Sequence, residues 1–242
     1  MKRLRNNIFA TAAVAVACIL GTTSAKAQEF TVQGDLVSSY VWRGVYQTGA
    51  SFQPTLGFSA GNFSLTAWGS TSLSESNKEI DLTAAYNLGE SGPTLSVASL
   101  WWAGQGAGKY FNFKSHETAH FFEAGLAYTL PCEKLPLSMA WYLMFAGADK
   151  NEEGKQNYSS YCELNYPFSV KSVDLNATVG FVPYKTYTVG YGNSGFAFTN
   201  VALKATTAIR ITDSFSLPIF AQAIWNPCLE DAHLVFGITL KP

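Results

Sequence analysis

Residues 30–46 read FTVQGDLVSSYVWRGVY, and this stretch decides the fold class. Large apolar side chains alternate along it with polar ones such as Asp35 and Arg43. Successive side chains of a β-strand point to opposite faces, so the alternation predicts one strand with an apolar face and a polar face. The apolar parity holds Phe30, Val32, Leu36, Tyr40, Trp42 and Tyr46.

The same alternation recurs to the end of the chain. Ile80, Leu82 and Ala84, for example, oppose Glu79 and Asp81. Alternation and turn residues together predict about twelve antiparallel strands. Because the apolar faces carry large aromatic residues and the polar faces carry charges, the predicted fold is all-β: a transmembrane antiparallel β-barrel with lipid outside and polar groups inside.

The connections between the predicted strands alternate between short and long. The short ones contain the Gly, Pro, Asp and Ser residues typical of tight turns. In bacterial outer-membrane barrels the periplasmic turns are short, the extracellular loops are longer and the strand number is even. We expect the loops at 103–115 and 184–195 to fold over or into the mouth. The short connections are 61–62, 89–93, 131–136, 167–172 and 212–215.

The first 27 residues have the character of an export signal. Three basic residues precede an apolar run, and Ala25-Lys26-Ala27 has the small-x-small form of a cleavage site. We therefore predict a cleaved signal peptide at residues 1–27 and a barrel at residues 28–242, located in the bacterial outer membrane. A lipid anchor on Cys18 is the alternative.

Composition limits the partners. The formal net charge is −1, so nothing favours nucleic acid. No stretch after the leader approaches the roughly 20 apolar residues of a spanning helix. The expected partners are outer-membrane lipid, the outer-membrane assembly machinery and a small polar solute, with no cofactor. Cys132, Cys162 and Cys228 lack the short spacing of metal ligands, so we expect free thiols and no metal site.

Outward aromatic residues fall at two heights, as the interfacial girdles of a membrane barrel do. A soluble barrel would gain nothing from this arrangement, because its apolar face points inward. The predicted girdle contains Tyr86, Tyr128 and Tyr166 near the turns, and Trp42, Trp101 and Trp225 near the loops.

Three stretches carry a resemblance to a known family: residues 38–45 (SSYVWRGV), residues 52–54 (FQP) and residues 65–70 (LTAWGS). Together they resemble the opening of the TorF family of porin-like proteins. Members of that family pair a Tyr-x-x-Arg-Gly motif with a downstream Pro and a Trp-Gly or Trp-Ala step. The resemblance covers about the first third of the predicted mature chain. It implies an outer-membrane channel and supplies no functional residue.

The inward parity places charged residues in the lumen, where they must be hydrated or paired. Since carboxylates outnumber bases, we expect a pore for cations or neutral solutes. The alternative is a paired network that plugs a narrow barrel, in which Asp174 and Arg210 could meet. The candidates are Asp35, Arg43, Glu79, Asp81, Glu117, Glu123, Glu163, Asp174, Lys204 and Arg210.

Arg43 is the candidate constriction residue, because it lies high on the first predicted strand next to Gly44. The alternative is a salt bridge to Glu230 or Asp231, since the first and last strands must close against each other.

Inward aromatic residues provide a second lumen feature. They could form a stacking path for sugar rings or another flat solute, or simply fill the interior, as bulky side chains do in small barrels. The candidates are Trp68, Trp102, Phe121, Tyr142, Tyr161 and Phe220.

These observations predict a passive channel for small polar solutes. One alternative is a non-conducting barrel with a structural or surface-interaction role. A membrane enzyme is a further alternative, and it would need a clustered Ser, His or acidic site facing lipid or one rim. His116 and His120 share one parity, but the chain has no recognisable hydrolase signature.

Overall fold

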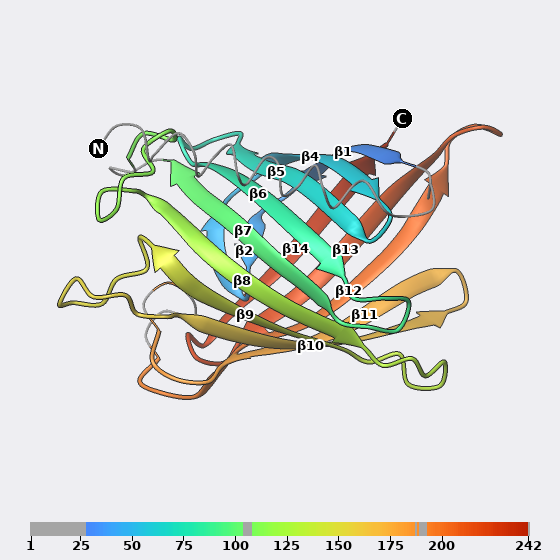
Figure 1. Ribbon diagram of the computed structural model, residues 1–242. Helices are drawn as coiled ribbons and strands as arrows, with labels where there is room; N and C mark the ends of the chain where they lie inside the picture. Colours follow the sequence, from blue (N-terminus) through green and yellow to red (C-terminus); the bar gives the residue numbers. More distant parts are fainter. Residues whose placement is uncertain (1–27, 104–107, 187, 189–192, 242) are drawn as a thin grey trace.

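The computed structural model describes residues 28–103, 108–186, 188 and 193–241. Twelve strands form a closed antiparallel barrel, which confirms the predicted all-β barrel (Figure 1). Sequential wall strands pair with one another, and β1 closes the ring between β14 and β4. Among the described residues, no helix is long and apolar enough to cross a membrane. The wall consists of β1 (Glu29–Val37), β4 (Ser51–Ala60), β5 (Phe63–Ser72), β6 (Lys78–Asn87), β7 (Thr94–Ala103), β8 (His120–Thr129), β9 (Ser138–Gly147), β10 (Ser160–Val170), β11 (Val173–Val182), β12 (Ala197–Arg210), β13 (Ser216–Asn226) and β14 (Asp231–Leu240).

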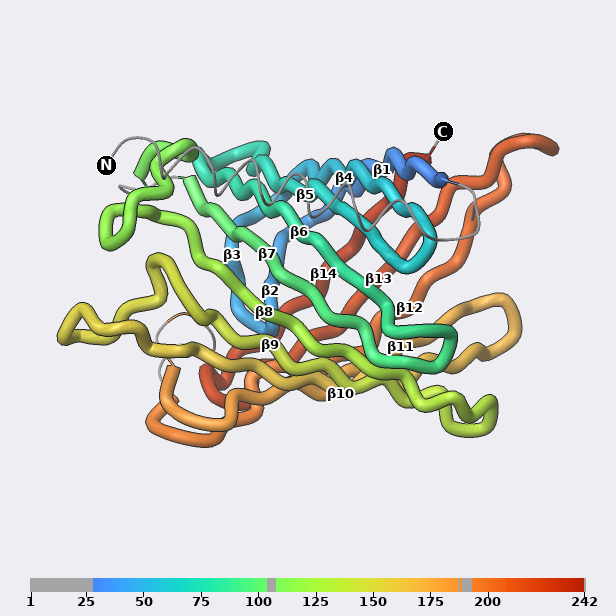
Figure 2. Tube along the Cα trace, in the orientation of Figure 1, coloured from blue at the N-terminus to red at the C-terminus, as the bar shows by residue number. Residues whose placement is uncertain are grey.

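Two short strands, β2 (Tyr40–Trp42) and β3 (Val45–Thr48), pair only with each other. In the side view of Figures 1 and 2 they lie behind the front wall strands, and the packing of Trp42 against buried wall residues places them inside the ring. The prediction of one strand from residue 30 to 46 is therefore wrong. The Ser38 N–H still donates to the Phe236 carbonyl of β14, and beyond it the chain turns into the lumen.

The turn between β2 and β3 explains why the predicted strand breaks. Trp42 pairs with Val45, which leaves Arg43 and Gly44 as a two-residue loop. Both have positive φ angles, +52° and +83°. Two consecutive positive φ angles are the signature of a type I′ turn, the tight connection that matches the twist of a hairpin. The Arg43-Gly44 pair, which lies between Trp42 and Val45, thus reverses the direction of the chain.

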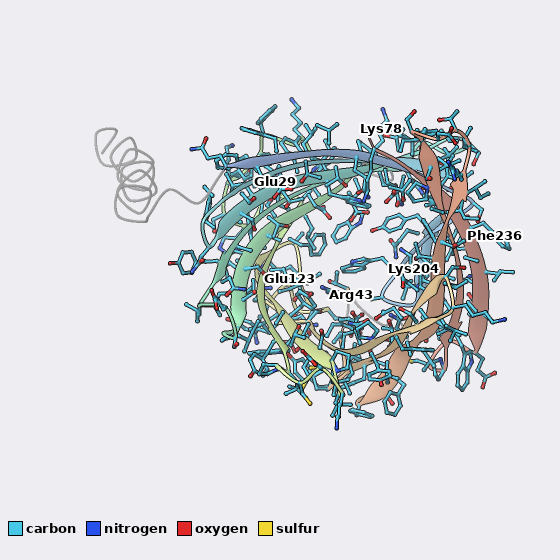
Figure 3. The ribbon with its side chains drawn as sticks, turned by 90° about the vertical axis from the view of Figure 1, so that its right-hand side faces the viewer. Glu29, Arg43, Lys78, Glu123, Lys204 and Phe236 are labelled. Carbon is cyan, nitrogen blue, oxygen red and sulfur yellow. The ribbon has the colours of Figure 1, made fainter. Side chains whose placement is uncertain are left out.

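Along the wall the two faces differ as the alternation predicts. Large apolar side chains are exposed on the outside, including Phe30 (73% exposed), Leu82 (47%) and Phe236 (54%). In Figure 3, Phe236 lies outside the ring while Arg43 lies within it. The buried residues Leu100, Met144 and Tyr161 belong to a cluster that packs against Trp42 of β2.

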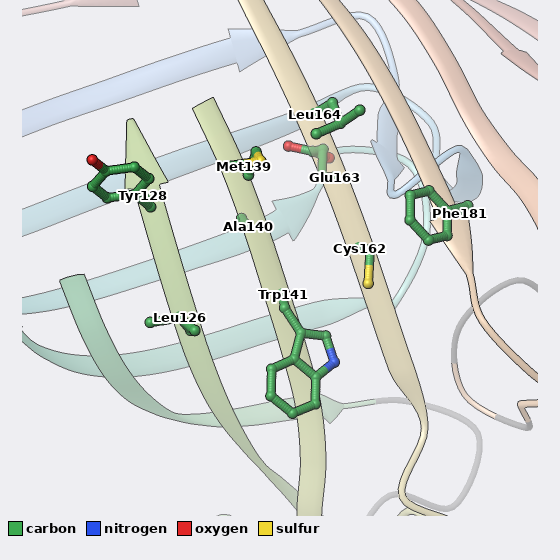
Figure 4. A pocket seen from close by; sticks show the side chains of 9 residues that line it. All are labelled: Leu126, Tyr128, Met139, Ala140, Trp141, Cys162, Glu163, Leu164 and Phe181. Atoms are coloured by element: carbon green, nitrogen blue, oxygen red, sulfur yellow. The ribbon is translucent and has the colours of Figure 1, made fainter. Parts of the chain in front are cut away.

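The outer wall carries an apolar groove across β8–β11 (Figure 4). Leu126, Trp141, Cys162 and Phe181 are among the residues that line it. Cys162 is a free thiol, as are Cys132 and Cys228.

Most of the predicted girdle residues lie on the outer face. Trp42 does not: its ring lies 5.6 Å from that of Trp102 inside the barrel, so its assignment to the girdle is wrong. The cause is the inward turn of the chain after β1, which removes Trp42 from the wall. Trp101, Trp225, Tyr86, Tyr128 and Tyr166 occupy outward positions of wall strands.

Candidate functional site

The candidate site is built around the inner hairpin, which we define as residues 38–50. It leaves the wall between β1 and β4 at the end of the barrel that carries the longer connections. Its tip, Arg43 and Gly44, reaches wall strands far from its own base. Figure 3 shows Arg43 within the ring and Glu123 on the wall.

Arg43 forms a bidentate ion pair with Glu123 of β8. Its two terminal nitrogens lie 2.7 and 2.8 Å from the two carboxylate oxygens. The side chains are only 9% and 7% exposed. Burial lowers the pKa of the Arg43 guanidinium, but the charge and hydrogen bonds of Glu123 outweigh it and raise this pKa overall. Arg43 is therefore a permanent cation. The alternative pairing of Arg43 with Glu230 or Asp231 is wrong.

Aromatic rings surround the same guanidinium. Its central carbon lies 4.4 Å from the ring centroid of Trp42, 4.5 Å from that of Tyr142 and 4.7 Å from that of Tyr161. Rings at this distance stabilise a cation through their negative faces. Two wall strands and the hairpin itself thus hold Arg43 in a fixed position.

Gly44 docks the tip against the opposite side of the wall. The Asn226 side-chain amide of β13 donates to the Gly44 carbonyl over 3.0 Å. A Cβ atom at position 44 would lie 1.8 Å from the Thr199 carbonyl oxygen of β12. Only glycine allows this close approach, so the hairpin spans the lumen from β8 to β12 and β13.

The inward aromatic residues pack around the inner hairpin. Tyr40 meets Trp68 with ring centroids 5.4 Å apart, and Trp102 lies 4.8 Å from Phe121. These contacts surround the hairpin with rings in the half of the lumen near the longer connections.

Below the hairpin, the lumen is polar. Glu163 accepts hydrogen bonds from Tyr161 Oη at 2.6 Å and Asn165 Nδ2 at 2.7 Å. The Lys204 ammonium lies 4.0 Å from the centre of the Phe220 ring. The Gln33 side-chain amide donates a hydrogen bond to Asp35 Oδ1 over 3.3 Å. This part of the lumen therefore mixes both signs of charge with hydroxyls and amides.

Three predicted lumen charges lie elsewhere. Asp174 is opposite Thr206 rather than Arg210 and is exposed near the turn end, where it accepts a hydrogen bond from Ser169. Arg210 is exposed and pairs with Asp213. Their predicted meeting is wrong because strand register offsets them by four residues. Glu117 is also exposed, in the connection before β8, where it pairs with Lys114.

The connection before β8 covers part of the outer wall. His120 faces outward yet is fully buried, because the rings of Tyr110 and Phe113 pack on it. Its Nδ1 lies 2.8 Å from Ser99 Oγ, and its Nε2 lies 2.5 Å from the Tyr110 carbonyl oxygen. The described part of this loop therefore lies against the outer face and not over the mouth as expected. Residues 104–107, 187 and 189–192 of the two loops are outside the described residues.

Comparison with known proteins leaves the family open: no family model matches the chain, and no curated protein matches it.

Proposed function

We propose that this protein is an outer-membrane channel for small polar solutes whose lumen is narrowed by the inner hairpin. The observation that carries the proposal is the contrast between the two sides of the wall. A charged, hydrogen-bonded hairpin tip lies inside, and large apolar side chains are exposed outside. A passive solute would diffuse through the polar lumen and pass beside the hairpin, whose tip the buried Arg43–Glu123 pair holds in place.

The outer face supports a membrane location. Soluble proteins rarely expose extended apolar surfaces, whereas a barrel in lipid requires an apolar outer band. Leu56, Leu203 and Leu234, on three different strands, are each about half exposed on this face. The proposed partners are therefore outer-membrane lipid and the machinery that inserts barrels. Export by a cleaved signal peptide stays a prediction, because residues 1–27 lie outside the described part of the chain.

The inner charges support a preference for cations. Glu123 and Arg43 neutralise each other, which leaves Asp35 and Glu163 against Lys204 in the polar part of the lumen below the hairpin. Rings of acidic side chains favour cations in pores. The proposed channel therefore passes cations and neutral solutes better than anions.

We also propose membership of the TorF family. The residues that carry the resemblance support it, because the Tyr-x-x-Arg-Gly motif of Tyr40 to Gly44 includes β2 and the hairpin turn. A family motif at a constriction would fit a channel.

Single-channel recording in planar bilayers tests the proposed channel. We expect small, stable conductance steps and a reversal potential that indicates cation preference. Arg43→Ala and Glu123→Ala should each enlarge the steps, because they release the hairpin tip from β8. Glu153→Ala, which alters an exposed loop carboxylate, is the matched control and should leave the steps unchanged. A folded barrel without conductance in all forms would overturn the proposal and favour a structural or surface-interaction role.

One contact favours a second candidate function, hydrolysis of an acyl ester in the membrane. Ser99 and His120 form an outward-facing hydroxyl–imidazole pair, the basic unit of a serine nucleophile and its base. Ser99 Oγ would attack the ester carbonyl while His120 takes the hydroxyl proton and returns it to the leaving alcohol; water would then release the acid. It ranks second because His120 is fully buried and its other nitrogen faces a backbone carbonyl rather than a carboxylate.

A fluorophosphonate probe separates the two functions. Labelling of the folded protein that Ser99→Ala abolishes would support the hydrolase. A protein that stays unlabelled would leave the Ser99–His120 pair as a clamp that holds the loop on the outer wall.

A further inference from the structure

Two carboxylates face the inner hairpin from neighbouring inward positions of β6. Glu79 is 4% exposed, and one oxygen of each carboxylate, Glu79 Oε1 and Asp81 Oδ1, is buried without a hydrogen-bond partner. Neither residue takes part in an ion pair of the described chain. Buried carboxylates without a counter-charge are costly, so this pair calls for a cation or a shared proton.

A second observation points to a ligand at the same place. Ser70 of β5 lies directly opposite Glu79, is 4% exposed, and its hydroxyl has no hydrogen-bond partner. The carboxylates therefore share their side of the lumen with an oxygen that is also unsatisfied. Oxygen atoms of this kind are the ligands that hard cations prefer.

The hairpin adds another such oxygen. Thr48 is 3% exposed, and its hydroxyl is buried without a partner. Thr48 is opposite Tyr40 in the hairpin, and the Tyr40 ring packs on Trp68, which is opposite Asp81. Thr48 is therefore paired with the hairpin residue whose ring packs on β5, next to the β6 strand that carries the two carboxylates.

Charge balance selects the valence of the cation. Three carboxyl groups surround the hairpin, those of Glu79, Asp81 and Glu123, and Glu123 already binds the one positive charge, Arg43. Glu79 and Asp81 are left without a counter-charge, and one divalent cation would neutralise both carboxyls in their ionised form. Ca²⁺ accepts six to eight oxygen ligands in flexible geometry, whereas Mg²⁺ demands a near-ideal octahedron. A site assembled from two strands and a hairpin suits the flexible geometry of Ca²⁺ better.

We propose that Glu79 and Asp81, together with the hydroxyls of Ser70 and Thr48, bind one Ca²⁺ ion that fastens the inner hairpin to the barrel wall. No group of three His, Cys, Asp or Glu residues suited to a metal occurs in the described chain, so hydroxyls and water complete the coordination. The site holds the hairpin near its base, while Arg43 and Gly44 hold its tip. This inference goes beyond the proposed function, because it does not depend on conduction.

Terbium luminescence tests the site directly. The folded protein in detergent micelles is freed of metal with a chelator and titrated with Tb³⁺, which takes the oxygen ligands of Ca²⁺. Trp68 and Tyr40, which contact each other beside Glu79 and Asp81, would sensitise the emission. We expect saturation at one ion per chain, displacement by Ca²⁺ and weaker displacement by Mg²⁺.

Variants identify the ligands. Glu79→Gln and Asp81→Asn should each weaken Ca²⁺ binding by at least roughly tenfold, because loss even of outer partners of metal ligands commonly costs 10–100-fold. Ser70→Ala, a mild change that keeps the fold, should weaken it less. Glu153→Gln and Asp213→Asn are controls, since both alter exposed carboxylates that already pair with bases.

The outcomes separate this inference from the channel. Absence of saturable Tb³⁺ emission, or unchanged Ca²⁺ binding in both Glu79→Gln and Asp81→Asn, would overturn the Ca²⁺ site and indicate a shared proton instead. Ca²⁺ binding by a barrel that does not conduct would sustain the site and reject the channel.

Discussion

Gly44 is the residue whose identity the fold constrains most closely. Its φ of +83° and the 1.8 Å approach of a Cβ atom to the Thr199 carbonyl oxygen both require glycine. Gly44→Ala should therefore lower the free energy of unfolding by more than about 2 kcal/mol, since the left-handed conformation alone costs roughly 1–2 kcal/mol. Urea unfolding in detergent, followed by tryptophan fluorescence, measures the change.

A second glycine supplies the control for that measurement. Gly154 also has a positive φ, +73°, but a Cβ atom there would meet nothing within 4 Å. Gly154→Ala should lower the free energy of unfolding only by the cost of the left-handed backbone conformation, because the new Cβ atom collides with nothing. If both substitutions lower stability equally, the close docking of Gly44 against β12 is incorrect.

The buried Arg43–Glu123 ion pair should also contribute to stability. Removing one partner leaves a buried charge, so Arg43→Met or Glu123→Leu should each lower the free energy of unfolding by about 3–5 kcal/mol. The double variant should be more stable than the sum of the single changes implies. A double-mutant cycle in urea measures this coupling. Additive losses would mean that water already screens the two charges.

At the scale of elements, Asp149 connects two loops. It is fully buried and accepts hydrogen bonds from the Ser159 N–H at 2.7 Å, the Ser159 hydroxyl at 2.6 Å and the Thr188 hydroxyl at 2.7 Å. Hydrogen bonds to a charged group contribute about 1.5–3 kcal/mol each. Asp149→Ala should therefore speed amide hydrogen exchange in residues 148–159 and around Thr188.

Asp213 provides the control for the hydrogen-exchange experiment. Asp213→Ala removes an exposed carboxylate in a turn at the other end of the barrel, so it should leave exchange in these loops unchanged. Exchange that is equally slow in Asp149→Ala and the unmodified protein would show that other contacts hold the loops together.

The wall could be predicted from the sequence, whereas the inner hairpin could not. A period of two fixes which side chains share a face, and twelve strands follow from its repetition. The same period continues through β2 and β3, so it cannot distinguish a wall strand from one inside the lumen. The Arg43-Gly44 turn is the local signal. The turn is held by the contact between Arg43 and Glu123, which are 80 residues apart in the sequence. The spacing of apolar and polar residues does not predict such a contact.

At the scale of the whole molecule, the inner hairpin and the outer wall depend on one another. A closed barrel of twelve strands encloses more space than its own side chains fill, and the hairpin occupies part of it with Trp42 and Tyr40. The same chain leaves its apolar residues on the outside, where burial within the protein cannot account for them. The proposed lipid environment accounts for the outer apolar residues.

Neighbouring positions on β6 test that environment. Leu82 points outward and is 47% exposed, whereas Thr83 points inward opposite Thr66 and Ala98. In lipid vesicles, Leu82→Arg should lower the free energy of unfolding by about 2–4 kcal/mol, the cost of a cation near mid-membrane. Thr83→Arg should cost less, because the lumen supplies polar partners. Urea titration in vesicles measures both. Equal losses would contradict the assigned faces, and a Leu82→Arg protein that is stable in vesicles would place this face in water rather than in lipid.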